Sequence, residues 1–157
     1  MKYEQEQPRF RQPGDVVLFL KALPLARRAQ RVRCAPLPEV VAAMGARGGR
    51  ERDPRRAQVA AGRACLRYGR WCGGLDTCLT RSLVAGAMLS DDHDVVLHVG
   101  FRPGSDDVPV DGHAWLTVDG EKMDAISPDG AFSPDDASGP YDVILEVPFD
   151  ADGRSGG

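Results

Sequence analysis

Asp76-Thr77-Cys78-Leu79-Thr80-Arg81-Ser82-Leu83 opens a segment in which apolar residues recur at helical spacing. Asp76 or Thr77 can cap this helix, because a short side-chain oxygen there accepts a hydrogen bond from an otherwise unpaired backbone N–H. The predicted helix ends near Leu89, before a turn-forming run of polar residues. Cys78 therefore falls in the first turn, where the positive end of the helix dipole favours a thiolate.

Further along, an alternating pattern from Gly112 to Val118 predicts a strand that begins near His113. A second strand, Lys122 to Ile126, follows across an Asp119-Gly120 turn. Neighbouring strands of such a hairpin place His113 and Asp124 roughly opposite each other. A cysteine at a helix start, a histidine on a strand and an aspartate on the next strand are typical of a nucleophile, its base and the acid that orients the base.

Other cysteines compete with Cys78 for the role of nucleophile. Cys72 is the nearest rival, but it lies in a glycine-flanked segment with no helix start behind it. We expect Cys34 and Cys65 to be packing residues. The spacing of the cysteines is not that of a zinc or redox site, so we expect no metal and no structural disulfide.

The base and the orienting acid also have rivals. His98 lies in the preceding predicted strand and is expected to pack beside the site, whereas His93 is expected on the surface of a turn. Asp119 ranks below Asp124 because it lies in the turn, too close to His113 along the chain. The register of the hairpin that carries His113 and Asp124 is predicted only to within a residue or two.

Stabilising the oxyanion of an acyl-transfer intermediate requires preorganised donors. The backbone N–H of Cys78 is the first candidate. The second remains open between the indole N–H of Trp71 and a backbone group near Gly73-Gly74.

The segment from about Arg55 to Ile126 resembles the transglutaminase-like cysteine peptidases that remove leader peptides in lasso peptide biosynthesis. The resemblance rests on four matches: Thr77-Cys78-Leu79-x-Arg81-Ser82-Leu83, Val99-Gly100, Gly112-His113-Ala114-Trp115-x-x-Val118, and Asp124. It implies a transglutaminase-like, papain-like fold, a Cys78-His113-Asp124 triad and no cofactor. It also implies three partners: a precursor peptide, a small leader-recognition protein and an ATP-dependent lasso cyclase. Acyl transfer to an amine and a non-catalytic peptide-binding module remain alternatives.

Charge is distributed very unevenly along the 157 residues. Residues 1–70 hold 16 of the 20 Lys and Arg and 6 of the 23 acidic residues, whereas the remainder is strongly acidic. Such asymmetry suggests a charged partner. The arginines are not interleaved with stacking aromatics, so we expect no nucleic-acid partner. Without a long apolar run or a signal peptide, the chain is expected to stay off membranes and in the cytoplasm.

The order of the predicted elements, helices first and strands afterwards, is that of an α+β fold with an antiparallel sheet. Helices are predicted from Asp15 to a bend or end at Pro24, from Glu39 to Met44 and from Pro54 to about Tyr68; strands are predicted at Asp94–Phe101 and Tyr141–Val147, with a polar loop at Arg102–Asp111. We divide the chain into a helical segment (1–53), a catalytic domain (54–147) and a disordered tail (148–157).

The helical segment combines apolar clusters with arginines, among them Arg27, Arg28 and Arg31. An apolar surface with a cationic rim suits an apolar, partly acidic partner. We therefore expect residues 15–45 to dock the leader peptide or its recognition protein. The competing interpretation is that these helices cover the back of the sheet.

Overall fold

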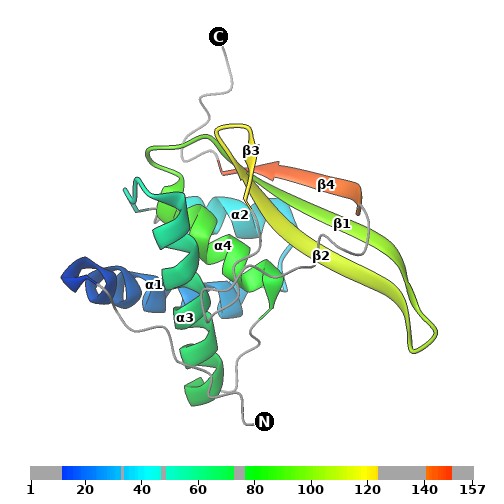
Figure 1. Cartoon of the computed structure of the whole chain (residues 1–157), viewed down its shortest axis with the longest axis horizontal. Helices are drawn as coiled ribbons and strands as arrows, with labels where there is room; N and C mark the ends of the chain where they lie inside the picture. The colour runs from blue at the N-terminus through cyan, green and yellow to red at the C-terminus, as the bar shows by residue number, and fades with distance from the viewer. Residues whose placement is uncertain (1–11, 33, 47–48, 73–76, 124–140, 150–157) are drawn as a thin grey trace.

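The computed structural model describes residues 12–32, 34–46, 49–72, 77–123 and 141–149 (Figure 1). Within these ranges the elements are α1 (Pro13–Val32), α2 (Leu37–Gly45), α3 (Pro54–Cys72), α4 (Cys78–Leu89), β1 (Val95–Ser105), β2 (Val108–Val118), β3 (Glu121–Lys122) and β4 (Asp142–Pro148). The predicted α+β arrangement, with helices first and an antiparallel sheet after them, is confirmed. Among the described helices, none has the length and apolar character that crossing a membrane requires.

The sheet has the order β3-β2-β1-β4 and two faces of different character. The helices lie together on one side of it (Figure 1). Because side chains alternate along a strand, Ala114, Leu116 and Val118 of β2 join the buried core of the helix side. His113, Trp115 and Thr117 alternate with them. We call the face that carries these three residues the outer face.

Helix α4 forms the centre of the core. Its segment from Leu83 to Leu89 is buried without a break. It packs against the other three helices and against β1 and β2. Burying one leucine or valine side chain contributes about 1.5–3 kcal/mol, so this helix anchors the whole domain.

The flanking helices α1 and α3 pack against each other and against α4 through small residues. Ala22, Ala26 and Ala29 of α1 and Ala57, Ala61 and Ala64 of α3 are almost completely buried. Both sets have the spacing i, i+4, i+7, which lines one face of a helix. Small side chains on such a face let helices approach closely.

Pro24 lies inside α1, so of the two predicted outcomes, a bend or an end of the helix, the end is wrong. A proline inside a helix removes one hydrogen bond and costs about 3 kcal/mol. Here Pro24 is exposed, whereas Leu25, Ala26 and Ala29 beyond it are buried in the core. Packing of this second half outweighs the local cost.

The predicted loop at residues 102–111 is also wrong, because β1 and β2 continue through it as a long hairpin. Prolines and aspartates suggested a loop, but the register pairs Arg102 with Asp111 across the two strands. Arg102 Nη2 lies 2.6 Å from Asp111 Oδ2. This cross-strand ion pair stabilises the ladder beyond the end of the apolar pattern.

Residues 49–51, shortly before α3, run along the end of α4. The backbone N–H groups of Gly49 and Glu51 donate to the carbonyls of Ala87 and Met88, at 2.9 and 3.0 Å. These carbonyls belong to the last turn of α4, where no helical N–H remains to bond them. Phe149, which we had placed in the tail, is buried and its N–H donates to Val95 O at 2.8 Å.

Gly86 of α4 is needed for the packing of Phe149. A Cβ at position 86 would lie 2.5 Å from the Phe149 ring, whereas one at Gly45 would lie 3.9 Å from it. We expect Gly86→Ala to destabilise the protein by about 1–3 kcal/mol through overpacking, despite the better helix propensity of alanine. Urea unfolding measures this, with Gly45→Ala as the matched control. Equal midpoints for the two variants would contradict the prediction.

Candidate active site

Helix α4 begins at Cys78 because two threonines cap it. Thr80 N donates to Thr77 Oγ1 at 3.2 Å, and Thr77 N donates to Thr80 Oγ1 at 3.0 Å. This reciprocal capping box satisfies two N–H groups that a helix start would otherwise leave unpaired. Of the two predicted caps, Thr77 is confirmed; Asp76 lies outside the described residues. Cys78 is thereby fixed as the first residue of the helix.

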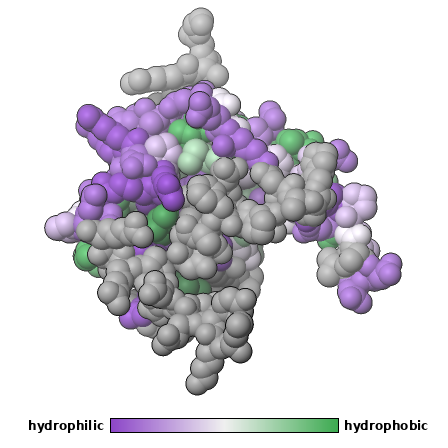
Figure 2. Space-filling model, viewed as in Figure 1, coloured by the Kyte–Doolittle hydropathy of each residue, from purple (hydrophilic) through white to green (hydrophobic). Residues whose placement is uncertain are grey.

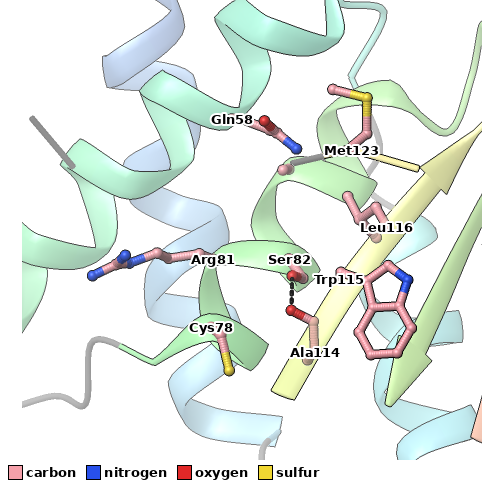
Figure 3. Close-up of a pocket in the computed structure, with 9 residues that line it drawn as sticks. Gln58, Cys78, Arg81, Ser82, Ala114, Trp115, Leu116 and Met123 are labelled. Atoms are coloured by element: carbon pink, nitrogen blue, oxygen red, sulfur yellow. Dashed lines mark hydrogen bonds between the residues drawn. The ribbon is translucent and has the colours of Figure 1, made fainter. Parts of the chain in front are cut away.

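Cys78 lines a cavity of about 60 Å³ between the helices and the edge of β2 (Figure 3). Its walls come from three elements and the residue after β3: Gln58, Cys78, Arg81, Ser82, Ala85, Ala114, Trp115, Leu116 and Met123. Ser82 Oγ donates to the Ala114 carbonyl at 3.3 Å, where α4 crosses β2. A cavity of this size has room for a few water molecules.

Gln58 gives the cavity a polar group that sequence reasoning missed. Its Oε1 atom is buried and has no hydrogen-bond partner among the described residues. Such an acceptor costs stability unless water or a ligand bonds it. No sequence signal distinguishes Gln58 from the other polar residues of its helix.

The direction of α4 places Cys78 near the part of β2 that carries His113. The C-terminal end of α4 leads into β1, whose first residue, Val95, pairs with Val118. Ser82 contacts Ala114, near the middle of β2. Cys78 precedes Ser82 by one helical turn, so it lies towards His113 and away from Val118.

The His113 ring packs against two aromatic rings whose own centroids are 6.2 Å apart. Its centroid is 5.9 Å from that of Trp115 and 5.1 Å from that of Tyr141. The structure thus places Cys78 and His113 beside the middle of β2, with Cys78 on the helix side of the sheet and the His113 ring on its outer face. Asp124 lies outside the described residues, although its predecessor Met123 lines the cavity. The side chain of Trp71 is likewise not described. The triad and the second oxyanion donor remain predictions.

His98 packs beside Trp115, in agreement with the sequence-based expectation. The two rings are stacked with centroids 5.6 Å apart. His98 Nε2 lies 2.9 Å from Thr117 Oγ1, and Nδ1 lies 3.3 Å from Glu146 Oε1. Both ring nitrogens are therefore engaged on the outer face.

His93 is not the surface residue that we predicted. Its side chain is only 16% exposed, and its Nδ1 lies 2.6 Å from Asp119 Oδ2 while Nε2 lies 3.0 Å from Arg52 O. Both partners are acceptors, so the imidazole satisfies both only when it is doubly protonated. The hydrogen bond to Asp119 raises the pKa of His93, and the same bond lowers the pKa of Asp119. Asp119 is thus the hydrogen-bond and ion-pair partner of His93.

This pair makes folding stability depend on pH. The raised pKa of His93 contributes stability that is complete below about 6.5, the unfolded value, and is lost as pH rises through the folded value. The lowered pKa of Asp119 contributes stability above about 3.8 that is lost in stronger acid. We expect His93→Gln to lose more stability at pH 6 than at pH 9, measured by urea unfolding. Asp119→Asn should lose the same pH-dependent part, and equal losses of His93→Gln at both pH values would contradict this account.

Comparison with known protein families assigns the chain to a superfamily. A family model described as the Transglutaminase-like superfamily matches residues 19–134. The chain therefore belongs to the transglutaminase-like superfamily, which includes cysteine peptidases and acyltransferases. No curated protein and no solved structure matches the chain. No group of three metal-binding side chains occurs within the described ranges.

Proposed function

We propose that this chain is a cysteine peptidase that removes the leader from a ribosomally made lasso peptide precursor. The observation that carries the proposal is Cys78, the first residue of a capped helix, which lines a cavity together with Ala114, the residue after His113 in β2. Membership of the superfamily and the resemblance to leader peptidases in the Cys78 and His113 motifs support it.

In the proposed reaction, Cys78 Sγ bonds to the scissile carbonyl carbon and His113 accepts the thiol proton. His113 then gives this proton to the leaving amine as the peptide C–N bond breaks. Water attacks the resulting thioester, releases the leader carboxylate and restores the thiol. Asp124 orients His113, and the backbone N–H of Cys78 donates to the oxyanion.

The test is to incubate the purified chain, with and without its recognition protein, with the precursor peptide encoded beside it. Mass spectrometry of the products should show the leader and the core as free peptides whose masses add up to that of the precursor plus one water. Acyl transfer is the alternative, because an amine can attack the same thioester. A product joined to an added amine, with no free acid, would favour transfer over hydrolysis.

We further propose that α1 docks the recognition protein. The start of α1 exposes Val17 and Leu20, at 51% and 57%. Figure 2 shows hydrophobic (green) and hydrophilic (purple) residues side by side at the left edge, where α1 lies in the same view. Arg27 and Arg31 are exposed further along, at spacings that continue the same stripe of the helix. Arg28 lies apart from this stripe, because its Nε donates to Ala43 O of α2 at 2.9 Å. An apolar stripe with a cationic end fits an acidic, partly apolar partner surface.

We expect the double variant Arg27→Glu, Arg31→Glu to bind the recognition protein more weakly and with a smaller salt dependence. Exposed arginines add little stability, so the fold should persist, with circular dichroism as the check. Arg50→Glu, at a position 84% exposed, is the control for a general charge effect. Unchanged affinity and salt dependence in the folded double variant would reject docking at α1.

A further inference from the structure

Three charged or polar side chains from three segments meet on the outer face of the sheet. They are Arg102 of β1, Asp111 of β2 and Tyr141, which precedes β4. Asp111 Oδ2 accepts hydrogen bonds from Arg102 Nε at 2.7 Å and from the Tyr141 hydroxyl at 2.9 Å. The Arg102 guanidinium also lies over the Tyr141 ring, 4.3 Å from its centroid. Each side chain therefore fixes the other two.

This cluster holds Tyr141 against His113. The two ring planes are tilted by 31°, and Trp115 stacks on His113 at 20°. Gly100, the cross-strand partner of His113, makes the space for this arrangement. A Cβ at Gly100 would lie 3.0 Å from the Trp115 ring and 3.0 Å from Tyr141 Cβ. Gly100 of the Val99-Gly100 match thus leaves the space in which Trp115 and Tyr141 pack.

We propose that Tyr141 is a positioning residue for His113, and that the opposite charges of Arg102 and Asp111 hold Tyr141 in place and balance each other beside the imidazole. The catalytic part of this inference rests on the proposed function, whereas the placement of the ring does not. None of the three residues was a candidate in the sequence, because the hairpin that unites them was predicted as a loop.

The balance of charges is the part that can be measured most directly. An imidazolium is stabilised by the carboxylate of Asp111 and destabilised by the guanidinium of Arg102. Hydrogen bonds from Tyr141 and Arg102 lower the pKa of Asp111, so the carboxylate is ionised throughout the range in which histidine titrates. Removing either charge alone should therefore leave the remaining charge uncompensated beside the His113 imidazole.

Other ionisable groups near the stack stay unchanged in these variants. His98 stacks on the far side of Trp115 and pairs with Glu146 of β4. Lys122 of β3 lies over the Trp115 ring, 5.5 Å from its centroid. Cys78 of α4 lines the cavity beside the middle of β2, on the helix side of the sheet.

The experiment is an NMR titration of the His113 ring in the full chain, assigned with a His113→Gln variant. We expect Arg102→Gln to raise the pKa of His113 and Asp111→Asn to lower it, each by about half a unit to one unit. Arg50→Gln removes an equal charge elsewhere and should leave His113 unchanged. Shifts in the same direction, or no shift in either variant, would overturn the charge balance whether or not the chain cleaves any peptide.

Positioning is tested by kinetics on the precursor peptide. Tyr141→Leu should lower kcat by about 10–100-fold with little change in KM, because only the orientation of the base is lost. Tyr141→Phe keeps the ring and should restore most of kcat. If the wild-type chain cleaves no precursor, the proposed function fails and the titration alone decides the placement of His113. If Tyr141→Leu cleaves at the wild-type rate, the positioning role fails while the proposed function stands.

Discussion

We expect Cys78→Ala to abolish cleavage of the precursor peptide, with a loss of at least ~10³-fold in kcat, because the proposed thioester forms on Cys78 Sγ. Cys34→Ala, Cys65→Ala and Cys72→Ala should leave most of the activity. Discontinuous mass-spectrometric assays under saturating precursor measure the difference. The substitution removes one sulfur from a half-buried helix start, so the fold is expected to remain.

Labelling provides a test of the same residue that does not require a substrate. At slightly acidic pH, iodoacetamide should modify Cys78 before Cys34, although Cys34 is the more exposed thiol. Cys65 is buried and should react only on unfolding. Peptide mapping identifies the modified positions. Faster modification of Cys34 than of Cys78 would contradict the assignment of Cys78 as the nucleophile.

The second large effect is expected at the base and its orienting acid. His113→Gln should lower kcat by about 10³–10⁴-fold, because the general base is lost. Asp124→Asn should lower kcat by a comparable factor, because the wrong imidazole tautomer is then favoured. His98→Gln and Asp119→Asn are the matched controls. His98 is engaged by Thr117 and Glu146, and Asp119 by His93, so neither is available to the proposed reaction.

The kinetic and stability measurements have to be read together for these four variants. Asp119→Asn should show its effect in urea unfolding rather than in kcat. A large loss of kcat in Asp119→Asn with full activity in Asp124→Asn would mean that the predicted hairpin register is wrong.

Local signals were sufficient to predict the start of α4 and the strand that follows His113. Thr77, which precedes the apolar helical pattern, indicated where α4 is capped. The alternation of apolar and polar residues indicated which residues of β2 share a face. Both are properties of short segments. The α+β class followed from the order of such segments.

Contacts between distant segments were what the sequence did not reveal. Arg102 and Asp111 look like loop residues until the cross-strand pair and Tyr141 are seen together. His93 looks exposed until Arg52, 41 residues earlier, supplies a carbonyl. Pro24 is tolerated because of packing that follows it. In each case tertiary contacts outweighed the local preference of the residue.

The alanines of α1 and α3 have a consequence for how this protein tolerates change. Where two helices pack through alanine side chains, there is no larger side chain to shorten and no space for a larger one. In a saturation mutagenesis screen for solubility, positions such as Ala22, Ala29, Ala61 and Ala64 should reject nearly every substitution except glycine or serine. Large core residues such as Leu97 should accept other aliphatic side chains. The positions that most limit sequence drift in this chain are therefore among its smallest side chains.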